Sequence, residues 1–185
     1  MDAWKVVLLG EKGVGKTNLA VQFTMDCFTS MYEPLTDDEP FRKQLVVDNK
    51  MCFIEVIETQ GQEEYNNLRD DLLRDGQGFV LIYSISSRFT FDQLERFHQC
   101  IRRVRPENPV FVLVGNKCDK AYEREVSKEE GSALAQQLGC EFIETSAKTA
   151  QNVHRMFSNL VRSLRRPVVF APIPKEVKKP RCVIV

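Results

Sequence analysis

The 185-residue sequence has no net charge, two histidines and no long apolar run. Its 26 Lys and Arg side chains are balanced by 26 Asp and Glu side chains, whereas nucleic-acid-binding domains usually carry a basic excess. No run of about 18 apolar residues occurs, so we expect no membrane-spanning helix. The first residues also lack the pattern of a secretory signal. These absences favour a protein made in the cytosol that does not bind nucleic acid.

Cysteine and histidine are present without the spacing that their chemistry requires. The six cysteines, at positions 27, 52, 100, 118, 140 and 182, form neither a paired framework nor a zinc pattern. We expect the first five to be reduced thiols, with Cys118 the one that could be exposed enough to oxidise. His98 and His154 fall in predicted helices and match no nucleophile or metal arrangement, so packing is the role expected for both.

Apolar runs alternate with helix-like segments. The strand-like runs are 4–9, 44–47, 52–57, 79–85, 110–115 and 141–144, and the helix-like segments are 16–25, 88–104, 128–138 and 149–166. This alternation predicts one α/β domain with a six-stranded, mostly parallel sheet and helices on both faces. The four residues Val47-Asp48-Asn49-Lys50 are too short for a crossover helix, so the second and third strands are predicted to form an antiparallel hairpin at one edge.

The first motif directly follows the first predicted strand. Gly10-Glu11-Lys12-Gly13-Val14-Gly15-Lys16-Thr17 fits the phosphate-loop pattern of a glycine, four residues and Gly-Lys-Thr. In such a loop the backbone N–H groups face phosphate oxygens, and the following helix adds its positive dipole end. Lys16 is predicted to neutralise β- and γ-phosphate charge, and Thr17 to bind Mg²⁺. The predicted phosphate-binding residues are Gly13, Val14, Gly15, Lys16, Thr17 and Asn18.

A second motif, Asn116-Lys117-Cys118-Asp119, stands at the C-terminal end of a strand, where open α/β sheets bind ligands. The Asp119 carboxylate can accept hydrogen bonds from the N1–H and exocyclic amine of guanine, whereas adenine offers neither donor there. Asn116 can tie this loop to the phosphate loop, and the stem of Lys117 can cover the base. Asp119 therefore predicts guanine selectivity and disfavours an adenylate-type kinase.

A third motif, Ser146-Ala147-Lys148, follows the last predicted strand. Its backbone N–H groups could meet the guanine carbonyl. Taken alone, Ser146 equally fits the N-cap of the helix that follows.

With these motifs the chain resembles the Ras subfamily of small GTPases over residues 3–166 and the last four residues. The likeness includes Phe28, Tyr32-Glu33-Pro34, Phe41-Arg42-Lys43-Gln44, Gly61-Gln62-Glu63-Glu64-Tyr65 and Glu144-Thr145-Ser146-Ala147-Lys148. It implies a P-loop G domain that binds GTP or GDP with Mg²⁺, is on with GTP and is turned off by hydrolysis. The partners implied are an exchange factor, a GTPase-activating protein and effectors.

The resemblance also implies roles for single residues. Phe28 would pack on the nucleotide, the Gly61 N–H would contact the γ-phosphate, and Gln62 would orient the attacking water. Thr17, Thr36 and Glu58 would hold Mg²⁺, with Glu58 in the place of the family's shorter aspartate.

Four departures from the family pattern cluster at the γ-phosphate. Lys12 stands where most Ras proteins have glycine, Glu58 and Gln60 replace an aspartate and an alanine, and Leu35 adds one residue ahead of Thr36. Lys12 could obstruct stimulated hydrolysis or lend its charge to the γ-phosphate, and we favour obstruction. Two hypotheses follow: a GTPase that depends on an activating protein, and a GTP-loaded binding module with strongly impaired hydrolysis. Pro40 further removes a donor near the strand on which Ras effectors pair.

The last residues have a composition of their own. Residues 167–185 are rich in proline and basic side chains, which is typical of a flexible linker, and Cys182-Val183-Ile184-Val185 fits the prenylation pattern. One prenyl chain binds membranes only marginally, so the tail's cations are the expected second signal. We therefore expect a G domain at 1–166 and a basic tail lipidated at Cys182. The expected location is the cytoplasmic face of the plasma membrane, as a monomer.

Overall fold

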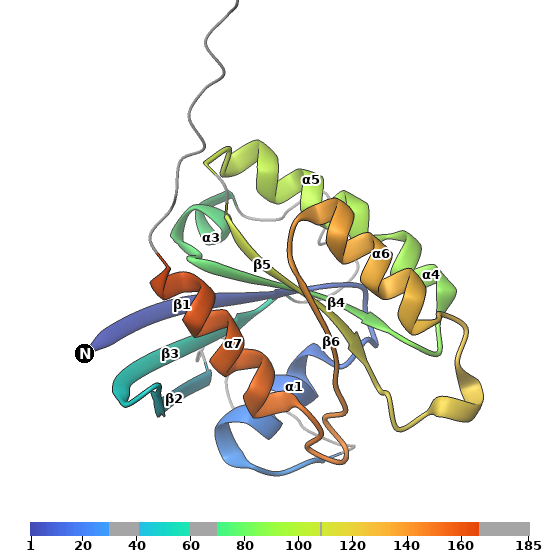
Figure 1. The fold of residues 1–185 in the computed structure, drawn as a ribbon, viewed down its shortest axis with the longest axis horizontal. Helices are drawn as coiled ribbons and strands as arrows, with labels where there is room; N and C mark the ends of the chain where they lie inside the picture. The colour runs from blue at the N-terminus through green and yellow to red at the C-terminus, as the bar shows by residue number, and fades with distance from the viewer. Residues whose placement is uncertain (30–40, 60–69, 108, 167–185) are drawn as a thin grey trace, which may run out of the picture.

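The computed structural model describes residues 1–29, 41–59, 70–107 and 109–166 (Figure 1). Several predicted features lie outside these residues: Leu35, Thr36, Pro40, Gln60, Gly61, Gln62 and the tail with Cys182. The phosphate loop, both predicted base-binding loops and Glu58 lie inside them.

A six-stranded sheet forms the centre of the molecule, in the order β2-β3-β1-β4-β5-β6 (Figure 1). Its strands are β1 (Asp2–Leu9), β2 (Phe41–Val47), β3 (Lys50–Glu58), β4 (Gly78–Ser84), β5 (Val110–Asn116) and β6 (Glu141–Glu144). Every adjacent pair is parallel except β2 and β3. The predicted α/β architecture and its mostly parallel sheet are confirmed.

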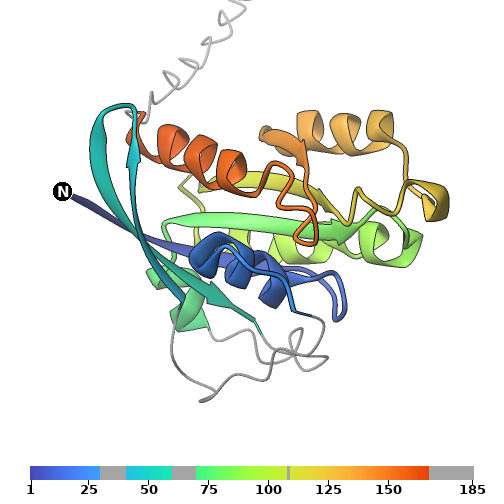
Figure 2. The ribbon, with the colours of Figure 1, turned by 90° about the horizontal axis from the view of Figure 1, so that it is seen from below.

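The antiparallel exception is the predicted hairpin. Its turn residues Asp48 and Asn49 both have left-handed backbone, with φ of 51° and 61°. Two such residues make the turn whose twist matches a right-handed pair of strands, and Asn and Asp tolerate this backbone well. The turn lies beside the end of α7 (Val153–Arg165), where Arg162 pairs with Asp48 and Arg165 donates to the carbonyl of Val47 (Figure 2). The hairpin edge is thereby fixed to a helix.

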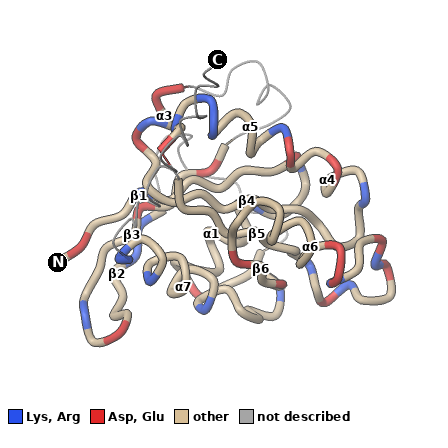
Figure 3. Tube along the Cα trace, turned by 45° about the horizontal axis from the view of Figure 1, so that its top comes forward, with Lys and Arg blue, Asp and Glu red and all other residues tan. Residues whose placement is uncertain are grey.

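Helices cover both faces because residues in the strands alternate between two cores. Val6 and Leu8 of β1 pack with α1 (Lys16–Met25) and α7, whereas Val7 and Leu9 pack on the opposite side. The elements on that opposite side are α3 (Asp70–Asp75), α4 (Arg88–Asp92), α5 (Leu94–Val104) and α6 (Lys128–Leu138). β4 is buried along its whole length, and β4 and β5 carry no charged residue (Figure 3). This continuous apolar pattern is the one expected for strands covered on both faces.

Two predicted helices differ from the observed ones. The helix predicted over 149–166 begins only at Val153, because Ala150 and Asn152 have φ of 61° and 58°, a backbone that an α-helix cannot use. The helix predicted over 88–104 is interrupted at Gln93 and forms α4 and α5. A short 3₁₀ turn at Ala121–Glu123 and α3 were not predicted. Among the helices described, none is long and apolar enough to cross a membrane.

Candidate nucleotide-binding site

The predicted site residues meet at one end of the sheet. β1 leads into the phosphate loop, β3 ends at Glu58, β5 ends at Asn116 and β6 ends just before Thr145. Since β1, β3, β5 and β6 all run in the same direction, their C-terminal ends form a single edge. This is the position at which open α/β sheets bind ligands.

The phosphate loop requires glycine at two positions for different reasons. At Gly10, with φ of 152°, an added Cβ would overlap the backbone carbonyl of Ile82 in β4. At Gly15, with φ of 97°, an added Cβ would lie 2.6 Å from the Nδ2 of Asn116. Gly15 is also the N-cap of α1 and supplies no side-chain cap. The loop is therefore closely packed from behind, and the first N–H groups of α1 suit an anion.

The two lysines of the phosphate loop lie in different surroundings. Lys16 is buried, and its ammonium donates to the carbonyls of Gly10 at 2.5 Å and Glu11 at 3.2 Å. Lys12 is exposed. The charge of Lys16 is thus held against the loop backbone, as phosphate neutralisation requires, while the charge of Lys12 is accessible from outside.

Two of the three predicted magnesium ligands are brought together. Glu58, at the end of β3, is hydrogen-bonded to the side chain of Thr17 in the first turn of α1. Burial raises the pKa of the Glu58 carboxyl, although the Thr17 hydrogen bond and the charge of Lys16 act in the opposite direction. Its Oε2 is buried and has no hydrogen-bond partner. Paired oxygen ligands with one unsatisfied buried oxygen fit a hard cation such as Mg²⁺, which needs few protein ligands when phosphates supply others.

Asn116 joins the base side of the site to the phosphate side. Its side chain is almost fully buried, its Nδ2 donates to the carbonyl of Val14 at 2.8 Å, and its Oδ1 accepts from Thr145 Oγ1 at 3.1 Å. The tie between Asn116 and the phosphate loop that the sequence predicted is present. Lys117 adds a second tie, because its ammonium donates to the carbonyl of Gly13 at 2.5 Å. Burial lowers the pKa of Lys117.

Asp119 is exposed and held by one side chain. Its Oδ1 accepts a 2.6 Å hydrogen bond from the hydroxyl of Ser146, which itself accepts from the backbone N–H of Thr149 at 3.1 Å. Ser146 is not the N-cap of α7, which is Asn152, but its hydroxyl caps the turn at 147–149 through Thr149. The contact of this loop's backbone N–H groups with the guanine carbonyl stays a prediction, and the structure adds that the Ser146 hydroxyl orients the Asp119 carboxylate.

The remaining predicted residues fall around this pair of loops. Ala147 is buried and Lys148 is exposed, and Phe28, three residues after α1, keeps 42% of its surface exposed. Asn18 lies within α1. Thr36, Gly61, Gln62 and Cys182 lie outside the described residues, so their expected roles stay predictions.

The cysteines and histidines show no second site in the part of the chain that is described. The five described cysteines are free, as expected, but Cys27 is the exposed one. Cys118 is half-buried, and burial raises the pKa of its thiol. His98 packs against Phe111, with ring centroids 5.0 Å apart, and His154 pairs with Asp26 at 2.6 Å.

The sequence did not predict the residues that join the two base-side loops to each other. Thr145, fully buried, bonds to Asn116, and its backbone carbonyl accepts from the N–H of Cys118 at 3.0 Å. Arg124 binds Glu144 with both ends of its guanidinium. Glu144 and Thr145 belong to the motif Glu144-Thr145-Ser146-Ala147-Lys148, so a role for them near the site could have been predicted. A single arginine in a loop, such as Arg124, carries no local signal.

Comparisons with known proteins agree with this geometry. The model of the Ras family matches residues 5–166, a range that contains the phosphate loop and both base-side loops. Ras-like protein 1 of Pyricularia oryzae is 49% identical over 181 residues, covering 88% of this chain and 75% of its own length. Protein ras-2 of Neurospora crassa is 47% identical over 183 residues, covering 88% and 80%. Ras-like protein B of Aspergillus fumigatus is 45% identical over 190 residues, covering 90% and 79%.

Proposed function

This chain belongs to the Ras family, and from that premise we propose that it is a lipid-anchored switch whose GTP hydrolysis is restrained by Lys12. Membership carries the coarser statements directly: the protein is a small GTPase that acts as a signalling switch, and proteins of this family bind GTP and GDP with Mg²⁺. The assignment of single residues, the rate of hydrolysis and the membrane anchor are the proposal.

Guanine is recognised by Asp119, with Lys117, Phe28 and the loop of Ser146, Ala147 and Lys148 around the base. The support is the 2.6 Å hydrogen bond that orients the exposed carboxylate. A carboxylate accepts from two guanine donors at once, which makes these charge-assisted bonds selective. Asn116 ties these base-side residues to the phosphate loop through its hydrogen bond to the carbonyl of Val14.

The phosphates bind to the loop from Gly10 to Thr17, together with Asn18. The backbone N–H groups and the Lys16 ammonium offset the negative charge. Thr17, Thr36 and Glu58 are the metal ligands, supported by the contact between Thr17 and Glu58 and by the unpaired Oε2 of Glu58. When bound, Mg²⁺ neutralises charge on the β- and γ-phosphates.

Hydrolysis needs a positioned water and charge stabilisation. Gln62 orients a water molecule whose oxygen forms a bond to the γ-phosphorus while the bond from that phosphorus to the bridging oxygen breaks. The products are GDP and inorganic phosphate, and the two protons of the water leave with the phosphate. Lys16 stabilises the charge carried by the departing oxygens. Gly61 contributes its backbone N–H to the γ-phosphate. Most of the rate comes from an activating protein, as the family pattern implies.

The observation that carries the proposal of slow hydrolysis is the exposure of Lys12 in the phosphate loop. An exposed side chain next to Gly13 stands where an activating protein must insert a planar guanidinium beside the γ-phosphate. A flexible ammonium is a poor copy of that preorganised fork. Lys12 therefore hinders entry of the activating protein's guanidinium more than its own charge substitutes for that group.

A second candidate function is a binding module that stays loaded with GTP and signals by occupancy. It is favoured by Lys12 and by the sequence departures at Leu35 and Gln60. Effectors, an exchange factor and an activating protein remain its partners, but hydrolysis would contribute little to turning it off.

Single-turnover hydrolysis of bound GTP, with and without a Ras-type activating protein, separates the two functions. We expect weak stimulation of the native chain and at least about 100-fold stimulation of Lys12→Gly. Lys50→Gly, at an exposed residue of the hairpin, is the matched control and should behave as the native chain. Strong stimulation of the native chain would contradict obstruction by Lys12. No stimulation of either protein would favour the binding module.

The domain boundary and the anchor complete the proposal. Residues 1–166 form the GTP-binding domain, and residues 167–185 carry the prenyl chain on Cys182 to the cytoplasmic face of the plasma membrane, where the basic tail meets anionic lipid. The full chain, expressed in cells that prenylate proteins, should sediment with vesicles containing anionic lipid. Cys182→Ser should remain in the supernatant, and equal sedimentation of both would overturn the anchor. The protein is proposed to act as a monomer.

A further inference from the structure

Glu144 is the last residue of β6, a four-residue strand at the edge of the sheet. An edge strand is held by backbone hydrogen bonds on one side only. The loop that follows β6 contains Ser146, which orients Asp119. The position of that loop therefore depends on additional anchors.

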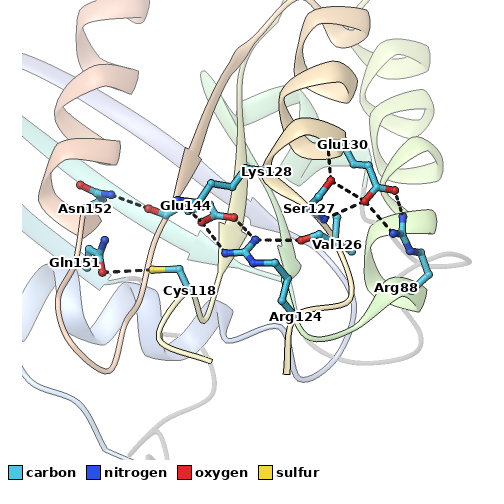
Figure 4. A network of polar contacts seen from close by, with 10 residues as sticks. All are labelled: Arg88, Cys118, Arg124, Val126, Ser127, Lys128, Glu130, Glu144, Gln151 and Asn152. Carbon is cyan, nitrogen blue, oxygen red and sulfur yellow. Dashed lines mark hydrogen bonds and ion pairs between the residues drawn. The ribbon is translucent and has the colours of Figure 1, made fainter. Parts of the chain in front are cut away.

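A two-pronged ion pair supplies one such anchor (Figure 4). Arg124 Nη1 lies 2.6 Å from Glu144 Oε1, and Arg124 Nη2 lies 3.0 Å from Oε2. Only 9% of the Glu144 side-chain surface and 23% of that of Arg124 are exposed. Lys128 also reaches Glu144 Oε2, at 3.7 Å. A paired and largely buried carboxylate is held firmly, because losing its partner leaves an uncompensated charge.

The two ends of this pair lie next to the two base-side loops in the sequence. Arg124 follows Asp119 by five residues, and Glu144 precedes Ser146 by two. The Arg124 end is fixed to the core, since the N–H groups of Glu125 and Val126 donate to the carbonyl of Ile85 at 2.8 and 3.1 Å. The pair thus joins the segment that carries Asp119 to the segment that carries its hydrogen-bond donor.

The backbone around Glu144 transmits this anchoring. The carbonyl of Glu144 accepts from Asn152 Nδ2 at 2.8 Å, which closes the loop onto the start of α7 (Figure 4). The N–H of Thr145 donates to the carbonyl of Gly115 at 3.0 Å, at the end of β5. A shift of Glu144 would move Ser146 relative to Asp119, because the residues directly after Glu144 make the contacts between the two loops from Cys118 N–H to the Thr145 carbonyl and from the Ser146 hydroxyl to Asp119.

We propose that Arg124 and Glu144 are positioning residues for guanine recognition, and that their fork keeps the Ser146 hydroxyl aligned with Asp119. This inference rests on the proposed guanine site. Neither residue touches the base; both act through Ser146 and Asp119. Loss of the fork would therefore weaken the contact to the exocyclic amine of guanine more than the contacts to the ribose and phosphates.

The test compares the dissociation rates of GDP and inosine diphosphate, which lacks only that amine, from the full chain. In the native chain GDP should dissociate more slowly, and the ratio of the two rates measures the amine contact. In Arg124→Ala this ratio should fall by about tenfold. Arg124→Lys keeps the charge without the fork and should lie between the two.

Arg162→Ala is the matched control. Arg162 also holds a carboxylate with two prongs, since its Nε and Nη2 lie 3.0 and 2.9 Å from the Oδ2 and Oδ1 of Asp48, but this pair lies at the hairpin turn between β2 and β3 and not at a base-side loop. Its rate ratio should equal that of the native chain. Glu144→Gln retains the shape of the side chain without a buried charge and serves if Arg124→Ala does not fold; its ratio should also fall.

Three results would overturn the inference. Equal acceleration of both nucleotides in Arg124→Ala would show a structural role only, and an unchanged ratio in a folded Glu144→Gln would contradict positioning. A native chain that releases both nucleotides at the same rate would overturn the guanine site itself, a failure distinct from the first two.

Discussion

The base side and the phosphate side of the site differ in how completely their polar groups are paired. On the base side, Asn116, Asp119 and Ser146 each bond to a partner in the protein. On the phosphate side, Glu58 retains a buried oxygen without a partner, and the ammonium of Lys16 bonds to carbonyls of its own loop. The base-side groups are each held by a protein partner, whereas the phosphate side contains an unpaired buried oxygen and an ammonium that suit added metal and phosphate.

This difference assigns the two halves different tasks. A surface already held by hydrogen bonds loses little entropy on binding, so the base side should determine which nucleotide is bound. The charge of Lys16 and the unpaired oxygen of Glu58 face the place where phosphates and metal are proposed to bind, so the phosphate side should determine hydrolysis. The departures from the family pattern at Lys12 and Glu58 both lie on the phosphate side.

The largest effect expected from breaking the base side alone is that of Asp119→Asn. The amide lacks the charge and presents a donor to the guanine amine, so GDP affinity should fall by about 100-fold. Xanthosine diphosphate, with a carbonyl in place of that amine, should bind the variant better than GDP does. Competition against a fluorescent nucleotide measures both affinities.

The same variant tests whether the two halves are independent. Bound xanthosine triphosphate should be hydrolysed by Asp119→Asn within about threefold of the rate of GTP in the native chain. Asp75→Asn, at an exposed residue of α3, should change neither affinity nor rate. A large loss of hydrolysis in Asp119→Asn would mean that the base side also controls the chemistry.

A smaller effect is expected from Glu58→Gln on the phosphate side. Because burial raises the pKa of this carboxyl, ionised Glu58 destabilises the nucleotide-free fold. The amide should stabilise that form by about 1 kcal/mol. The gain should be largest above the raised pKa and should shrink as the pH falls and the native carboxyl is protonated. GDP release in Mg²⁺ should quicken by about tenfold, since an amide oxygen is a weaker ligand.

Thermal unfolding of the nucleotide-free proteins and GDP release kinetics measure these two changes. Glu55→Gln on the same strand, where Glu55 pairs with Arg42, is the matched control and should leave GDP release unchanged. If Glu58→Gln lowers stability and releases GDP at the native rate, Glu58 is not a metal ligand.

The smallest effect is expected at Glu130, which neighbours the base side without belonging to it. Arg88, followed by the backbone and hydroxyl of Ser127, lowers the pKa of Glu130 from 4.5 to about 2. Its contribution to stability is therefore complete above pH 4.5 and is lost as the pH falls toward 2. Glu130→Gln should unfold at a slightly lower temperature than the native chain at pH 7 and at nearly the same temperature near pH 2. A difference in unfolding temperature that grows as the pH falls would contradict this assignment. GDP release from Glu130→Gln at pH 7 should equal that of the native chain.

Local sequence patterns predicted those parts of the fold that depend on residues close together in the sequence. The hairpin at Asp48 and Asn49 followed from loop length, and the phosphate loop followed from its glycines and its strand. The start of α7 was misplaced because Ala150 and Asn152 adopt left-handed backbone with no glycine to indicate it. The bond from Ser146 to Asp119 joins residues 27 positions apart, so sequence alone left Ser146 with two interpretations.

Distance along the sequence also explains why the ion pair between Arg124 and Glu144 was not predicted. Arg124 and Glu144 lie 20 positions apart, separated by α6, and they meet where β6 pairs with β5 beside the segment that follows the 3₁₀ turn. The exposed fraction of Cys27 relative to Cys118 is likewise decided by packing against neighbours distant in the sequence. Long-range pairs of this kind have no local signature.

The most direct test of separate tasks is the dissociation rate of GDP and of inosine diphosphate from the native chain, first in Mg²⁺ and then after chelation. Removing the metal should accelerate release of both nucleotides while their rate ratio stays constant within about twofold, because independent contributions add. A ratio that collapses toward one on chelation would show that guanine recognition depends on the phosphate side, and it would contradict the division of the site into two halves.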